Sequence, residues 1–238
     1  MKRFYKDNGF TLIELLTVIV IILILTGLIA AVYGYIQNRA ARERARAEIQ
    51  SFENALERYK EDNGGYPDDG ILSGANTYLS GTCAKLNPRT MGNPTSGSYA
   101  GTGYSAASLV LYRALSGDRD CDGVIGNGDK LLDIDGSVLA IPLPALPTIY
   151  VSFKPGQLKT ANGSTIISSS NKVTGIADPF GYSYGYSTAY NEYVTYSGTS
   201  ILVPGYNQTC DIWSTAGNLA DPPASGTDNV TPTWVTNW

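Results

Sequence analysis

The first thirty-odd residues combine a short polar stretch with a long apolar run. Residues 1–9 read MKRFYKDNG, and no charged residue occurs from Leu15 to Tyr33, a span of 19 residues. An α-helix of that length crosses a bilayer core of roughly 30 Å. The pattern predicts a membrane-spanning helix over residues 10–33, preceded by a basic leader that keeps its end of the chain cytoplasmic.

The residues after this run keep a helical period but become amphipathic. Apolar side chains recur three or four positions apart, at Ala41, Ala45, Ile49, Phe52, Leu56 and Tyr59. Neither glycine nor proline occurs in residues 36–63, and NGGYP at 63–67 supplies a helix end. We therefore predict one helix from Phe10 to Asn63, about 80 Å long. Its amphipathic half, residues 34–63, is expected to pack on a sheet of the same chain, the alternative being a free coiled coil.

The rest of the chain predicts one more helix and several short strands. Residues 64–147 are rich in glycine and small polar residues and predict a long loop region with a helix at 105–117, capped by Ser105 and ended by Gly117. In residues 148–238 the predicted strands are Thr148–Phe153, Thr165–Ser170, Tyr182–Ser187, Tyr193–Gly198 and Cys210–Thr215. A long helix laid across a small antiparallel sheet is an α+β fold.

Composition narrows the possible functions. The 238 residues include 17 Lys+Arg and 21 Asp+Glu, a net charge of -4, so nucleic-acid binding has little support. There is no histidine, which removes the commonest general base, and we expect no enzymatic activity. The three cysteines, Cys83, Cys121 and Cys210, lie far apart. In an oxidising compartment one pair could form a disulfide, or all three could be free.

A single carboxylate, Glu14, stands near the start of the apolar run. An ionised side chain in hydrocarbon costs roughly 2.5–3.5 kcal/mol even on insertion scales, so it needs a partner. A secretory signal peptide is one alternative. However, cleavage after Ala30 or Ala31 would require a small residue two positions earlier, and Leu28 and Ile29 stand there. A plain membrane anchor is the other alternative, and it leaves the carboxylate unexplained.

The sequence GFTLIE at Gly9–Glu14, after a short basic leader, resembles the processing site of type IV prepilins and type II secretion pseudopilins. The resemblance implies cleavage between Gly9 and Phe10 and N-methylation of Phe10 by a prepilin peptidase/methyltransferase. Cleavage creates a protonated amine at Phe10, one helical turn from Glu14. When subunits pack side by side, the carboxylate of one can meet the amine of its neighbour, which lowers the cost of both charges. We therefore expect Glu14 to act in assembly and not in catalysis.

Two later stretches resemble the major pseudopilin of type II secretion, general secretion pathway protein G. They are ALERYKEDNGGYP at 55–67 and DPFGYSYGY at 178–186, with a late Asp211–Ile212 and Trp238 in support. The resemblance implies a type IV pilin-like fold and a homo-oligomeric helical filament. Residues 71–147 are longer than that family's usual middle, which leaves open a major subunit, a minor subunit or a pilin of another fibre.

The same resemblance implies partners and a location. The partners are the membrane, the processing enzyme, an inner-membrane assembly platform and other minor pseudopilins or pilins. The location is the inner membrane, crossed once, with the globular part extracytoplasmic, and afterwards the pseudopilus or pilus. The alternative function is a membrane-anchored extracytoplasmic binding module or a minor adhesive type IV pilin.

A calcium loop is predicted at DRDCDGVIGNGD, residues 118–129. Counted as a 12-residue loop, it follows the EF-hand order of oxygen ligands, with a glycine for the sharp turn at Gly123. The expected ligands are Asp118, Asp120, Asp122, the carbonyl of Val124, and Asp129. The loop resembles those of dockerin modules, and a solvated acidic turn is the alternative. A second site in the C-terminal loop, at Asp221 and Asp228, has weaker support.

Overall fold

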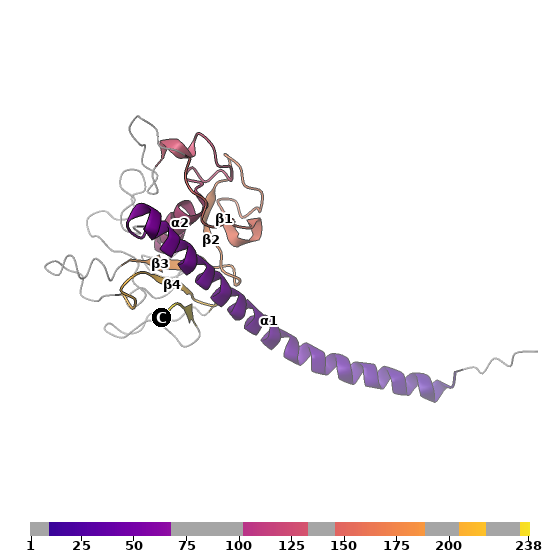
Figure 1. Ribbon diagram of the computed structural model, residues 1–238. Coiled ribbons are helices and arrows are strands. Elements are labelled where there is room, and N and C mark those ends of the chain that lie inside the picture. Colours follow the sequence, from indigo (N-terminus) through magenta and orange to yellow (C-terminus); the bar gives the residue numbers. More distant parts are fainter. Residues whose placement is uncertain (1–9, 68–101, 133–145, 189–204, 218–233) are drawn as a thin grey trace, which may run out of the picture. The chain divides into compact units, whose positions relative to one another are not determined.

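A computed structural model describes five parts of the chain, residues 10–67, 102–132, 146–188, 205–217 and 234–238 (Figure 1). The chain divides into two compact units, Met1–Ala41 and Arg42–Trp238. Helix α1 (Leu12–Asn63) contributes to both units. We call the second unit the head and describe each unit by itself.

In the first unit the apolar run is helical, as predicted, and its side chains are exposed. Residues 10–29 are all exposed. Among the described residues, α1 is the one helix long and apolar enough to cross a membrane. A contiguous apolar surface of this size marks a site of contact with lipid or with other apolar chains. The helix begins at Leu12, two residues after the predicted start at Phe10, because Thr11 caps it.

In the head, one face of α1 enters a hydrophobic core. Ala45, Ile49, Phe52, Leu56 and Tyr59 are at most 8% exposed, which confirms five of the six positions predicted from the apolar period. The sixth, Ala41, is only partly buried. Burying a side chain of the size of Phe52 or Leu56 stabilises a fold by about 1.5–3 kcal/mol. The amphipathic half of α1 is therefore a core element of the head, not a free coiled coil.

The predicted end of α1 is also confirmed. The Asn63 side chain donates to the Tyr59 carbonyl at 2.9 Å, and the Gly64 amide donates to the Lys60 carbonyl at 2.8 Å. Gly64 has a φ of +80°, a left-handed conformation that glycine adopts without strain.

Helix α2 (Thr102–Ser116) lies across the strands of the head (Figure 1). It begins three residues before the predicted start, so Ser105 lies within the helix and the prediction that it caps the helix was wrong. The added turn holds Tyr104, whose hydroxyl accepts from the buried Trp213 indole at 2.9 Å. The predicted end is confirmed, because Gly117 follows the helix with a φ of +77°.

The strands form two small antiparallel sheets. The first pairs β1 (Leu158–Thr160) with β2 (Val173–Ile176). The second has the order β3 (Gly185–Ser187), β4 (Asp211–Ser214) and β5 (Val235–Thr236). Two short 3-10 helices complete the described elements, η1 (Asp129–Leu131) and η2 (Pro155–Gln157). A long helix followed by small antiparallel sheets is consistent with the predicted α+β, pilin-like fold.

Two predicted strands contain observed ones, and two were wrong. Tyr182–Ser187 contains β3, and Cys210–Thr215 contains β4. Thr148–Phe153 forms no strand, because the Tyr150 and Val151 amides both donate to the Leu115 carbonyl at the end of α2.

Thr165–Ser170 forms no strand either, because the backbones of Ser168 and Asn171 bond to each other and close a turn. The fifth prediction, Tyr193–Gly198, lies outside the described residues. Strands β1, β2 and β5 were not predicted.

Strand β3 passes so close to the Trp213 ring that glycine is required at position 185. A Cβ atom built on Gly185 would overlap three carbons of the indole, and Trp213 is fully buried. The ring therefore has no room to move away.

We predict that Gly185→Ala lowers the free energy of unfolding of the head by about 1–3 kcal/mol, the usual cost of overpacking a core. Urea unfolding of the detergent-solubilised chain, followed by tryptophan fluorescence, measures the change. The matched control is Gly156→Ala in η2, where an added Cβ meets nothing within 4 Å. Equal stability of the two variants would contradict the packing described here.

Candidate functional site

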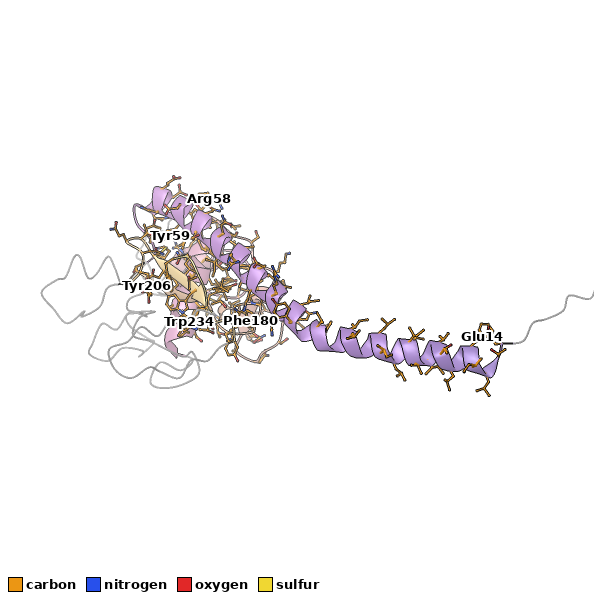
Figure 2. All side chains as sticks on the ribbon, turned by 90° about the horizontal axis from the view of Figure 1, so that it is seen from below. Glu14, Arg58, Tyr59, Phe180, Tyr206 and Trp234 are labelled. Atoms are coloured by element: carbon orange, nitrogen blue, oxygen red, sulfur yellow. The ribbon has the colours of Figure 1, made fainter. Side chains whose placement is uncertain are left out.

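The first turn of α1 carries Glu14 (Figure 2), and Phe10 lies two residues before the helix begins. These two residues are predicted to act in processing and assembly. Phe10 is 83% exposed. The Thr11 hydroxyl accepts from the Glu14 amide at 3.4 Å, while the Thr11 amide and hydroxyl donate to Glu14 Oε2 at 2.9 and 2.6 Å. This reciprocal arrangement is a capping box. Gly9 lies outside the described residues.

The capping box gives Glu14 a partner within its own chain. A carboxylate at a helix N-terminus satisfies free amide groups and is favoured by the helix dipole. The carboxylate is thus explained in part without any neighbouring subunit. The capping role of Thr11 was not predicted, although T-x-x-E at 11–14 is the sequence signal of this motif.

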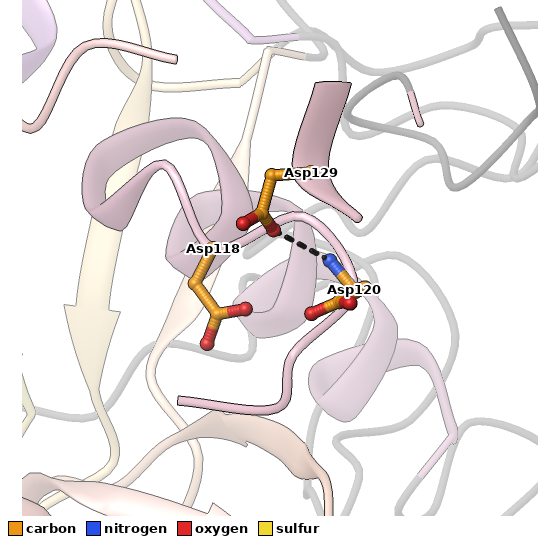
Figure 3. Close-up of side chains that lie close together, drawn as sticks. All are labelled: Asp118, Asp120 and Asp129. Carbon is orange, nitrogen blue, oxygen red and sulfur yellow. Dashed lines mark hydrogen bonds between the residues drawn. The ribbon is translucent and has the colours of Figure 1, made fainter. Parts of the chain in front are cut away.

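The predicted calcium loop follows α2 and brings three carboxylates together. Oxygen atoms of Asp118, Asp120 and Asp129 lie within 4.8 Å of one another (Figure 3). Asp118 and Asp129 are buried, with 2% and 0% exposure, and Asp120 is half-buried. Carboxylate oxygens are hard ligands of the kind that Ca²⁺ prefers.

Backbone amides of the loop hold these carboxylates in place. Asp129 Oδ1 accepts from the amides of Arg119 and Asp120 at 2.6 and 3.1 Å, and its Oδ2 accepts from the Gly126 amide at 2.7 Å. Asp118 Oδ2 accepts from the Tyr112 hydroxyl at 2.6 Å and from the Gly123 amide at 2.8 Å. The hydrogen bonds orient the carboxylates, which therefore do not depend on a bound ion for their position.

Gly123 takes the conformation that its predicted role requires. Its φ is +87°, and a Cβ atom there would lie 2.8 Å from Cγ2 of Ile167. Backbone conformation and space both select glycine at this turn.

Of the other two predicted ligands, Asp122 is not part of the carboxylate cluster. Asp122 Oδ1 accepts from the Val124 amide at 2.9 Å, a local turn that directs this oxygen to the backbone. The Val124 side chain is 67% exposed. Asp221 and Asp228, the weaker second site, lie outside the described residues.

The negative charge of the cluster has no cationic partner in an ion pair among the described residues. The Lys172 ammonium contacts the loop, but it donates to the backbone carbonyl of Asp120, at 2.9 Å, and not to a carboxylate. Burial raises the pKa of the Asp120 carboxyl, and repulsion from neighbouring carboxylates adds to the rise.

Two cysteines are buried free thiols. Burial raises the pKa of Cys121 to about 11 and that of Cys210 to about 12, so both are protonated and unreactive at neutral pH. Cys83 lies outside the described residues. Of the two alternatives left open by the sequence, the structure has Cys121 and Cys210 free and not in a disulfide.

Comparison with known proteins identifies the family. Residues 5–30 match a family model described as the prokaryotic N-terminal methylation motif. Type II secretion system core protein G of Aeromonas hydrophila is 35% identical to the chain over 134 residues, which cover 51% of this chain and 92% of the relative. The chain belongs to the type II secretion system core protein G family. This membership confirms the resemblance found in the sequence.

Other members of the core protein G family match a shorter part. The protein of Pectobacterium carotovorum subsp. carotovorum is 41% identical over 63 residues, and that of Vibrio cholerae serotype O1 is 38% identical over 73 residues. These matches span 40% and 50% of the length of the relatives. No solved structure matches the chain at a significant level. Family membership and the apolar helix together support membrane anchoring.

We predict that Thr11→Val loosens the first turn of α1, because the valine side chain can neither donate to nor accept from Glu14, which leaves only the backbone amide of residue 11 as a donor to this carboxylate. Loss of an N-cap costs about 0.5–2 kcal/mol, and amide hydrogen exchange at residues 12–14 should quicken accordingly. The measurement uses the full chain in detergent micelles.

The control for this variant is Thr26→Val, since among the described residues the Thr26 hydroxyl donates to the Ile22 carbonyl, one turn back, and to no other group. If Thr11→Val exchanges no faster than this control, the capping box does not stabilise the helix end.

Proposed function

We propose that the chain is a structural pseudopilin, processed between Gly9 and Phe10, N-methylated at Phe10, and assembled through α1 into the helical pseudopilus of a type II secretion-like system. The observation that carries this proposal is the match over 92% of the Aeromonas hydrophila core protein G. The methylation motif at residues 5–30 and the exposed apolar half of α1 support it. Family membership does not favour the alternative of a binding module or a minor adhesive pilin.

The proposed assembly follows from the two environments that the apolar half of α1 can occupy. Its exposed side chains are stable in lipid and equally stable against the apolar helices of other copies. Glu14 favours assembly, because the new Phe10 amine of a neighbouring copy can pair with its carboxylate. Repeated along an axis, such a contact between unlike surfaces is open-ended and builds a filament.

The proposed partners and location come from the same reasoning. They are a prepilin peptidase/methyltransferase, an inner-membrane assembly platform and other pseudopilins, with the head on the extracytoplasmic side of the inner membrane. No catalytic role is proposed, because a subunit of this kind acts through its contacts and the chain has no histidine.

We also propose that the loop at 118–129 binds Ca²⁺ and that the ion stiffens this part of the head. The carboxylates of Asp118, Asp120 and Asp129 would hold it, and the EF-hand order adds Asp122 and the Val124 carbonyl. The convergence of three carboxylates within 4.8 Å supports this proposal. A cation among them would remove their mutual repulsion.

The assembly proposal predicts that Glu14→Ala is inserted in the membrane but builds few or no fibres. Electron microscopy and shearing assays of cells that express the assembly system measure fibre yield. Normal fibres from this variant would contradict a pairing role for the carboxylate.

Two matched variants separate charge pairing from helix capping. Glu14→Gln keeps a side chain that can close the capping box but carries no charge, so we expect it to fail like Glu14→Ala. Thr11→Val keeps the charge and weakens the cap, so we expect it to assemble. Intact mass confirms the starting point, since wild type and all variants should begin at N-methylated Phe10. A mature wild type that begins at Met1 would refute the proposed processing.

The calcium proposal predicts that a chelator lowers the melting temperature of the wild-type head and that added Ca²⁺ restores it, because a ligand that binds only the native state stabilises it. Asp120→Asn should remove this difference. Differential scanning calorimetry in detergent measures it.

Asp120 is the best test position, because its carboxylate accepts one described hydrogen bond, from the Asp122 amide, so its loss disturbs the fold little. Glu61→Gln, an exposed carboxylate on α1, is the control and should keep the full response. Identical wild-type melting with and without chelator would refute the site.

A further inference from the structure

The charges of α1 beyond the apolar run are sorted along the helix. Residues 37–47 hold four arginines and one acidic residue, whereas residues 48–63 hold five acidic and two basic residues. The arginines are Arg39, Arg42, Arg44 and Arg46. The basic part thus follows the apolar run directly, and the acidic part lies farther along the helix.

Three of these arginines share one face of the helix. Arg39, Arg42 and Arg46 are spaced by three and four residues, which places them in one row, here called the basic stripe. Arg46 bonds to Glu43 at 3.0 Å, an exposed pair of little net stability. Arg39 and Arg42 form no hydrogen bond or ion pair with any residue that the structure describes.

An independent feature marks the membrane boundary just before the stripe. Tyr33, the last residue of the uncharged span, and Tyr35, two residues later, are 61% and 68% exposed. Tyrosines at the end of a membrane span sit at the level of the lipid headgroups. Arg39 lies four residues after Tyr35, within reach of the same layer, and long arginine side chains extend readily toward it.

We propose that Arg39 and Arg42, the part of the basic stripe nearest to the apolar run, bind the phosphate groups of anionic phospholipids at the membrane surface where that run ends. Guanidinium groups bind phosphate oxygens in bidentate fashion. Lipid is favoured over an acidic face of a second copy because the stripe continues directly from the span and its tyrosines. The inference rests on the proposed membrane anchoring but not on fibre formation.

The stripe also explains an unusual distribution of charge. Arginines near a span are normally retained on the cytoplasmic side, where the leader residues Lys2, Arg3 and Lys6 are proposed to lie. Four more arginines on the exported side work against that preference. Lipid phosphates on that side compensate them and hold the subunit in the membrane until a neighbouring subunit replaces them.

The test measures lipid preference directly. The full chain is reconstituted in phosphatidylcholine vesicles that contain trace spin-labelled phosphatidylglycerol or spin-labelled phosphatidylcholine, and electron spin resonance gives the relative association of the two lipids. Wild type should prefer phosphatidylglycerol, and salt should weaken the preference. Arg39→Gln combined with Arg42→Gln should reduce it by about fivefold for each arginine removed.

The control is Arg44→Gln combined with Lys154→Gln, which removes the same charge away from the stripe. It should keep the wild-type preference. No preference in wild type, or an equal loss in both double variants, overturns the proposal. Fibre loss in the stripe variant with unchanged lipid preference also overturns it and assigns the arginines to contacts between copies. Failure of fibre assembly in wild type refutes only the proposed function, because the vesicle measurement needs no fibre.

Discussion

The head depends on the burial of one face of α1. Phe52 on that face contacts Phe153 and Tyr184, with ring centroids 5.7 and 5.4 Å apart. Polar contacts lie beside these aromatic contacts: Tyr184 donates to Glu48 at 2.7 Å, and Asn237 donates to Glu53 at 2.9 Å. Segments far apart in the sequence therefore meet on one helix, and the same helix supplies the apolar surface proposed for assembly.

The long helix was predictable because its signals are local. The apolar period, the absence of glycine and proline, and NGGYP at 63–67 all act within a few residues of the feature that they determine. Strands depend on partners that are distant in sequence. Thr148–Phe153 has the composition of a strand, but two of its amides, those of Tyr150 and Val151, donate to the carbonyl of Leu115. Nothing in the sequence of the segment itself indicates this acceptor.

In the candidate sites, too, features with a local sequence signal were predictable, and features that depend on particular hydrogen bonds were not. The order of acidic residues in 118–129 was enough to select Asp118, Asp120 and Asp129, since the loop is short and Gly123 fixes its turn. The position of Asp122 was not predictable in this way, because it depends on whether one carboxylate oxygen bonds to the Val124 amide. The cap formed by Thr11 was not predicted, although T-x-x-E at 11–14 is its local signal, because the prediction for Glu14 rested on a partner in a neighbouring subunit.

Strand β5 has a consequence for biosynthesis. It completes the second sheet beside β4, and Asn237 exchanges hydrogen bonds with the backbone of Ile212 at 2.9 and 3.2 Å. These contacts involve residues made after all the rest of the head. During translation α1 therefore exists long before the head can close over it. Until residues 235–237 have emerged, β4 has one edge unpaired and the nascent head is most open to proteolysis and to pairing with other chains.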